Sequence, residues 1–402
     1  MANMRFRAAR WRALPAAIWA LGFGSLFMDI SSELIHSLLP VFMVSSLGAS
    51  MVVVGVVEGV AEATAAFVKL FSGALSDWFG RRKPLLVLGY ALGAASKPVF
   101  PLAGSVAWVF AARFVDRVGK GIRGAPRDAL VAEVAPANMR GAAYGLRQAL
   151  DSVGSLAGPL LALPLMVWFL GDIRSVLWVA TFPAVISVLV LIAYVREPER
   201  VEVRGAARPR LMFAGVGRLP GRYWIVVLLG AVFTLARFSE AFLVLRARDT
   251  GMPDGRVPLV LVVMNLFYAA GAYPAGSAAD RINRRVLLLG GLAMLVASNL
   301  VLAGATTPPT VLFGVALWGL HMALTQGLLA KLVSDATPGE LLGTAFGVFH
   351  LVSGAMLLVA SIVAGALWTT QGASATFLAG AAFAAIAAIG VWGVARRSAP
   401  EP

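Results

Sequence analysis

Ionisable side chains interrupt several of the long apolar segments of this chain of 402 residues. At about 100° per residue in a helix, Asp29, Glu33 and His36 fall on one stripe, and Glu58 and Glu62 fall on another. A carboxylate placed among apolar residues is costly and is usually functional, for example as a proton carrier. The candidate proton carriers are Asp29, Glu33, Glu62, Asp151 and Glu240.

Cationic side chains gather on one broad face of the segment 106–128, which carries Arg113, Arg117, Lys120, Arg123 and Arg127 with Asp116 among them. Arginine is suited to bidentate binding of a carboxylate or phosphate, so this face could bind an organic anion. The alternative is a mutually paired network, because acids and bases inside the apolar segments occur in equal numbers. Arg147 and Asp151, four residues apart, can form such a pair.

The elements that position these side chains are predicted to be membrane-spanning helices. The chain is 59% hydrophobic and only 13% charged, with a mean hydropathy of +0.83, and this charge is too little to cover a soluble surface. Apolar runs of about 20 residues can cross a bilayer as helices. We therefore predict an all-α membrane protein of twelve transmembrane helices, at residues 15–43, 50–76, 84–103, 106–128, 140–167, 174–195, 222–246, 256–279, 286–304, 308–332, 340–367 and 373–394.

The basic residues indicate how these helices are oriented. The net charge of +14 resides mostly at span ends, among them Arg81-Arg82-Lys83 and Arg396-Arg397, which argues against a nucleic-acid-binding surface. By the positive-inside rule these ends are cytoplasmic. We expect a multi-pass protein of the inner (cytoplasmic) membrane with both termini in the cytoplasm. The connector 246–256, which is also charged, is an exception on the outer side.

The chain divides into two halves that repeat each other. We predict a first six-helix bundle at 1–195, a polar cytoplasmic linker at 196–221 and a second six-helix bundle at 222–402. The segment from Gly73 to Arg82 matches the segment from Gly276 to Arg285, about 200 residues later, and each follows the second span of its half. Two parallel repeats of this kind are one construction used by secondary transporters.

The first of these segments resembles the signature of the major facilitator superfamily, Gly-x-Leu-Ala-Asp-Arg-x-Gly-Arg-Arg-Lys. Trp78 replaces an arginine in the first copy, and Asn283 replaces a glycine in the second. The resemblance implies a conformational gate at the cytoplasmic ends of the helices. Its candidate residues are Gly73, Asp77, Arg81, Gly276, Asp280 and Arg284.

The resemblance also implies two six-helix bundles that alternate access to a central cavity lined by the first, fourth, seventh and tenth spans. The candidate residues of the substrate cavity are Arg113, Asp116, Arg117, Lys120, Arg123, Arg237, His321 and Gln326. Gly154, Gly158 and Pro159 resemble a motif of proton-coupled antiporters, and two such glycines permit close helix packing. We expect transport of a small organic solute by a monomer, coupled to protons, with a preference for efflux and for an anion.

Other functions stay open at this stage. The alternatives are an uptake permease, a drug/proton antiporter for neutral or cationic amphiphiles, and a membrane receptor that does not transport. A membrane enzyme is disfavoured because the sequence has no metal-ligand motif, no nucleophile motif and no cysteine. We therefore expect no cofactor, no metal, no nucleic-acid partner and no ATP-binding site.

The orientation can be tested with reporter fusions. A reporter joined after Arg196, and another joined at the C-terminus, should both report a cytoplasmic location because both positions follow an even number of predicted spans. Protease accessibility in sealed vesicles provides an independent readout. A periplasmic C-terminus would contradict the predicted number of spans.

Overall fold

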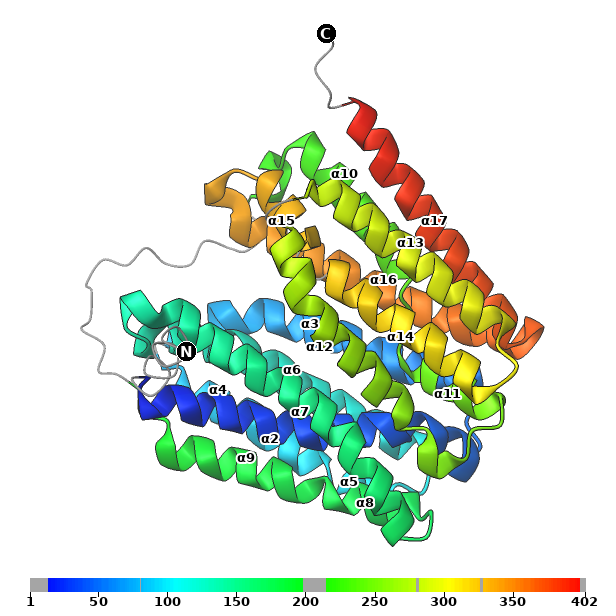
Figure 1. Ribbon diagram of the computed structural model, residues 1–402. Coiled ribbons are helices and arrows are strands. Elements are labelled where there is room, and N and C mark those ends of the chain that lie inside the picture. The colour runs from blue at the N-terminus through cyan, green and yellow to red at the C-terminus, as the bar shows by residue number, and fades with distance from the viewer. Residues whose placement is uncertain (1–13, 80, 198–214, 280–281, 326–327, 398–402) are drawn as a thin grey trace, which may run out of the picture. The chain divides into compact units, whose positions relative to one another are not determined.

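The computed structural model describes residues 14–79, 81–197, 215–279, 282–325 and 328–397, and within these ranges all regular secondary structure is helical. The chain forms two compact units (Figure 1). Unit 1 comprises Met1–His36 and Thr64–Arg210, and unit 2 comprises Ser37–Ala63 and Leu211–Pro402. The segment Ser37–Ala63 thus groups with unit 2, although it lies in the N-terminal half of the sequence.

Unit 1 is built from the helices of the first half of the chain. They are α2 (Ala16–Val41), α3 (Met51–Phe79), α4 (Lys83–Ser96), α5 (Val99–Leu102), α6 (Val106–Val134), α7 (Arg140–Trp168), α8 (Ile173–Val179) and α9 (Thr181–Tyr194). Of these, α2 contributes its C-terminal end and α3 its N-terminal part to unit 2. Helix α4 packs against α6 and α9, and Leu21, Leu86, Leu146 and Leu191 belong to one buried apolar core.

Unit 2 contains the remaining helices. They are α10 (Gly221–Leu235), α11 (Ala241–Asp249), α12 (Leu259–Ala279), α13 (Arg284–Gly304), α14 (Pro308–Thr325), α15 (Leu328–Asp335), α16 (Leu342–Gln371) and α17 (Ala373–Arg397). Helix α14 packs against α12 and α13, and α13 also packs against α17. A second buried core joins Tyr223, Val227, Val333 and Phe349.

Ten helical segments of the described chain are long and apolar enough to cross a membrane, and each coincides with a predicted span. The predicted span 106–128 lies in α6, which is long enough but carries too much charge to qualify on composition. The predicted span 222–246 lies in α10 and α11, which are two shorter helices. The all-α membrane fold is therefore confirmed, and the count of twelve spans stays a prediction.

The interruption between α10 and α11 differs from the single continuous helix expected at 222–246. No proline or glycine occurs from Ala236 to Glu240, so the cause is not a helix-breaking residue. Instead, serine side chains replace the missing helical hydrogen bonds. The backbone N–H of Ser239 donates to Ser361 Oγ at 3.2 Å, and Ser239 Oγ accepts from the N–H of Ala241 at 3.3 Å. Non-helical backbone at membrane depth requires such partners.

Glycines permit close helix contact in unit 2. A Cβ atom added at Gly55 or Gly59 of α3 would lie within 3.0 Å of the backbone of α16. On α16, Gly365 likewise approaches the backbone of α3 at Met51. Gly55 and Gly59 therefore allow close packing of the two helices, because any side chain at these positions would force the helices apart.

Candidate functional site

A buried ion pair joins α4 to α6 in unit 1. The Nζ atom of Lys97 lies 2.7 Å from Asp116 Oδ1 and donates to Ser32 Oγ on α2 at 2.9 Å. The side chains of Lys97 and Asp116 are only 1% and 3% exposed, so neither charge is screened by water. The Nε atom of Arg117 lies 3.9 Å from the second oxygen of Asp116. Charges this deeply buried are tolerated when they have partners, so the pair ties three helices together.

The cationic face predicted for α6 is buried over most of its length. Arg113, Arg117 and Arg123 are all buried, whereas Lys120 is exposed. The guanidinium carbon of Arg123 lies 4.5 Å from the centre of the Tyr90 ring on α4, within the range of a cation–π interaction. The four cations are therefore not equivalent, because Lys120 differs from the arginines in its exposure.

A polar chain connects Tyr90 to a second group of charges. The hydroxyl of Tyr90 lies 3.0 Å from Ser25 Oγ, which also accepts a hydrogen bond from Arg127. Atom Nη1 of Arg127 lies 3.7 Å from Asp151 Oδ2, and Nη1 of Arg147 lies 3.5 Å from the same oxygen. The predicted Arg147–Asp151 pair is present. The same carboxylate oxygen of Asp151 thus lies between two guanidinium groups.

The predicted packing motif of α7 lies against the two candidate carboxylates of α2. A Cβ atom added at Gly154 would lie 2.9 Å from Asp29 Cβ, and one at Gly158 would lie 2.9 Å from Glu33 Cβ. Both added atoms would also lie within 2.8 Å of backbone carbonyl oxygens of α2. Pro159 follows inside the same helix. The two glycines therefore permit the close approach that sets Asp29 and Glu33 against α7.

The two carboxylates of α2 differ in their partners. Glu33 Oε2 lies 3.3 Å from Nδ1 of His36, one turn along the helix. Asp29 has no hydrogen bond or ion pair with any residue that the structure describes. Charged groups from two neighbouring helices nevertheless act on it electrostatically: Asp151 of α7, and Lys120, Arg123 and Arg127 of α6. The third candidate from the N-terminal half, Glu62, is half-buried on α3.

Unit 2 holds a second group of candidate residues beside the α10–α11 interruption. His321 of α14 is fully buried, and its Nδ1 lies 2.7 Å from the carbonyl oxygen of Gly291, so this nitrogen carries the proton of the neutral ring. The ring of Phe233 lies 5.5 Å from that of His321 and 5.9 Å from the guanidinium carbon of Arg237. Glu240 and Arg237 interact electrostatically.

The predicted gate residues are only partly described. Gly73 lies on α3, where an added Cβ would lie 3.6 Å from that of Ala125 on α6, and Arg81 is exposed. Asp77 and Arg284 lie on helices, but their side chains fall outside the described part of the chain, as do Asp280 and Gln326 altogether.

The residues next to this motif have fixed partners. Nη2 of Arg82 lies 3.2 Å from Glu133 Oε1, and the carboxylate of Glu197 accepts hydrogen bonds from the backbone N–H groups of Arg82 and Lys83. Glu197 thereby caps the N-terminus of α4, where the helix dipole favours a negative charge. Lys83 Nζ also donates to the carbonyl oxygen of Ile192.

Sequence analysis missed Lys97, which the structure places at the centre of the charge network. Its signal was a single lysine inside the predicted span 84–103, and such a residue requires a buried partner. Among the described residues, no group of three or more His, Cys, Asp or Glu side chains could hold a metal ion.

The Lys97–Asp116 pair can be tested by a double-mutant cycle in detergent. Lys97→Met and Asp116→Asn should each lower the unfolding temperature, because removing one partner of a buried pair costs about 3–5 kcal/mol. In the double variant, the loss of stability should be much smaller than the sum of the losses in the two single variants. The difference is the coupling energy between the two side chains.

The matched control is the exposed pair Lys331–Asp335, whose charged atoms are 3.9 Å apart. Its coupling should be at most about 0.5 kcal/mol, as for exposed pairs on one helix. Additive losses at Lys97 and Asp116 would show that the buried pair does not stabilise the fold.

Comparison with known proteins agrees with this architecture. A family model described as the Major Facilitator Superfamily matches residues 21–246 and 226–402. An uncharacterised MFS-type transporter of Methanocaldococcus jannaschii is 31% identical over 387 residues, which cover 94% of each chain. The multidrug resistance protein MdtH of Yersinia pestis is 27% identical over 51% of this chain and 52% of its own length.

Solved transporter structures share the fold. The nucleoside transporter NupG superposes with a TM-score of 0.79 at 12% identity, covering 94% of this chain and 99% of that one. A D-xylose–proton symporter superposes with a TM-score of 0.73 at 15% identity, covering 94% and 97%. The matches to the family model together span nearly the whole chain, and the archaeal relative aligns over almost its full length. The chain therefore belongs to the Major Facilitator Superfamily of membrane transporters.

Proposed function

We propose that the protein is a proton-coupled secondary transporter of a small organic solute, and that Asp29 is the carboxylate that binds and releases the coupling proton. The observation that carries the proposal is the environment of Asp29. It is half-buried on α2 and has no hydrogen-bond or ion-pair partner among the described residues, yet it lies in the electrostatic range of four charged groups. When Asp29 gains or loses a proton, the net charge of this cluster of side chains changes by one unit.

The other carboxylates of unit 1 fit this role less well. Asp116 is paired with Lys97, Asp151 with two arginines, and Glu33 with His36. Protonating Asp116 or Asp151 would leave buried cations without a counter-charge, which is costly. Protonating Asp29 breaks no ion pair, so Asp29 can change its charge while the surrounding network stays intact.

We propose efflux by antiport as the direction, across the cytoplasmic membrane and with both termini in the cytoplasm. Gly154 and Gly158 support it, because they resemble the antiporter motif and lie directly behind Asp29 and Glu33. The similarity to a multidrug resistance protein over half of the chain agrees with it. The basic connectors support the orientation, since the clusters at 81–83 and 396–397 favour the cytoplasmic side.

We propose an organic anion as the substrate. Three buried arginines and Lys97 surround a single carboxylate, Asp116, on and beside α6, and arginine matches the geometry of an acidic group. During alternating access, the gate residues of the two repeated motifs would control entry from the cytoplasmic side. The solute would bind as a small-molecule partner without a cofactor, and the protein would act as a monomer.

The coupling role of Asp29 can be tested in proteoliposomes that contain a pH-sensitive dye, with a panel of organic acids as solutes. Asp29→Asn should abolish flux driven by a pH gradient, because an amide cannot carry the proton. It should keep solute exchange at equal pH on both sides, since exchange requires binding and alternating access but no net proton transfer.

Asp172→Asn is the control for the loss of one carboxylate. Asp172 accepts a hydrogen bond from the N–H of Arg174 at the start of α8, a position where asparagine also serves as a cap, so flux should be unchanged. Full gradient-driven flux in Asp29→Asn would exclude Asp29 as the carrier. Binding without any flux in the unmodified protein would instead indicate a receptor.

A further inference from the structure

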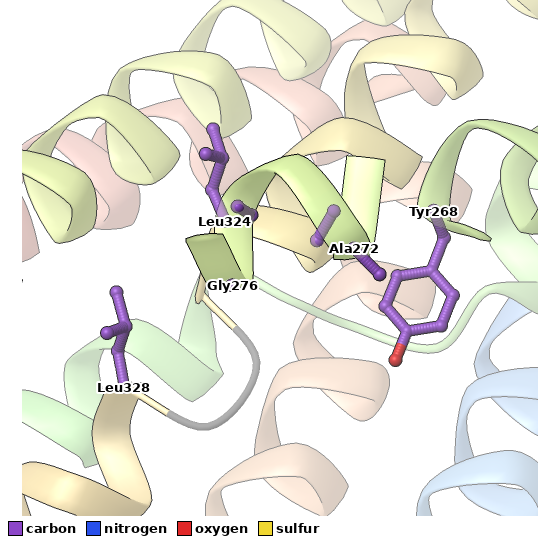
Figure 2. Close-up of a pocket in the computed structure, with 7 residues that line it drawn as sticks. Tyr268, Ala272, Gly276, Leu324 and Leu328 are labelled. Carbon is purple, nitrogen blue, oxygen red and sulfur yellow. The ribbon is translucent and has the colours of Figure 1, made fainter. Parts of the chain in front are cut away.

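A pocket of about 150 Å³ lies within unit 2, between α12 and the helices α14 and α15 (Figure 2). One stripe of α12 contributes Tyr268, Ala272 and Gly276, which are spaced four residues apart, and the opposite wall is formed by Ala323, Leu324 and Leu328. The walls are alkyl groups and backbone, apart from the hydroxyl of Tyr268 at one end (Figure 2). The pocket is thus apolar with one polar end.

A cation of the same unit acts electrostatically on the residue at this polar end. Arg237, at the α10–α11 interruption, interacts electrostatically with Tyr268 and with Glu240. Within the described residues its guanidinium group has no hydrogen bond and no ion pair within 4 Å, and its Nε is buried without a partner. A guanidinium group in this state can still form charge-assisted hydrogen bonds with an acidic group.

The neighbours of Arg237 do not supply that acidic group. The ring of Phe233 lies 5.9 Å from its guanidinium carbon and 5.5 Å from the ring of His321, which donates its Nδ1 proton to the carbonyl oxygen of Gly291. A neutral histidine offers no negative charge. Glu240 acts on Arg237 only as a nearby charge, through an electrostatic interaction. The guanidinium group of Arg237 can therefore donate hydrogen bonds to a ligand.

We propose that this pocket binds the ring of a cyclic or aromatic monocarboxylate, whose carboxylate group is bound by Arg237 and by the hydroxyl of Tyr268. A volume of about 150 Å³ holds one benzene-sized group. The alkyl walls favour an apolar ring, and the guanidinium group favours a negative charge next to it. A cationic amphiphile of the same size would meet a like charge at Arg237, which selects against it. The inference rests on the proposed transporter function and names its substrate class.

The test uses benzoate as the probe and measures its affinity for the purified full-length protein by calorimetry. The unmodified protein should bind benzoate and should not bind benzylammonium measurably. Arg237→Gln should weaken benzoate binding at least about tenfold, as expected for the loss of charge-assisted hydrogen bonds. Tyr268→Phe should weaken it by a smaller factor, because it removes one neutral hydroxyl.

Ala272→Leu should also weaken benzoate binding at least about tenfold, because the added side chain occupies the volume of the ring. The matched control is Ala270→Leu, which places the same side chain at an exposed position two residues away, outside the pocket lining. The Ala270→Leu variant should bind benzoate with the same affinity as the unmodified protein. Unfolding temperatures show that each variant is folded, and Ala272→Val replaces Ala272→Leu if the latter is not.

Three results would overturn the proposal: no benzoate binding by the unmodified protein, equal binding of benzylammonium, or unchanged affinity in Ala272→Leu. The proton-coupling proposal is separable from it, because Asp29 belongs to unit 1. If benzoate fails to bind while another solute shows flux that depends on Asp29, the pocket assignment is wrong and the transporter assignment stands.

Discussion

The dominant constraint on this molecule is that a charge carried into the membrane is costly unless the protein compensates it. Lipid cannot solvate an ammonium group or a carboxylate. A helix that carries a buried charge must therefore pack against the helix that supplies the partner of that charge. Lys97 illustrates this, because its ammonium group reaches Asp116 on α6 and Ser32 on α2 and thereby fixes three helices. The polar chain from Tyr90 through Ser25 to Arg127 joins the same helices at a second level.

Glycine packing and charge pairing act together in unit 1. Gly154 and Gly158 allow α7 to approach the backbone of α2, and the carboxylates of Asp29 and Glu33 are fixed at that contact. The charges of Asp151 and of the α6 cations then act on Asp29 without forming an ion pair with it. Within the described part of unit 1, Asp29 can change its charge by protonation while the paired residues hold the helices in place, which is what proton coupling requires.

Much of the fold could be predicted from sequence because span length and apolar composition are local properties. The predicted span 140–167 corresponds to α7 at Arg140–Trp168, and 373–394 corresponds to α17 at Ala373–Arg397. The interruption at Ser239 could not be predicted, since it depends on Ser361, which is distant in the chain. Likewise, sequence places Asp29 and Asp151 in spans but does not show that one is paired and the other is not. Which side chains pair with each other depends on tertiary contacts, and helical periodicity carries no information about those contacts.

The central claim is that the half-buried carboxylate of Asp29 takes up and releases the coupling proton. A hydrophobic carbodiimide reacts with protonated carboxyl groups, and mass spectrometry of the digested protein identifies the modified residues. The account predicts modification of Asp29, with Asp116 and Asp151 protected by their cationic partners. Modification of Asp116 or Asp151 with Asp29 left intact would contradict it.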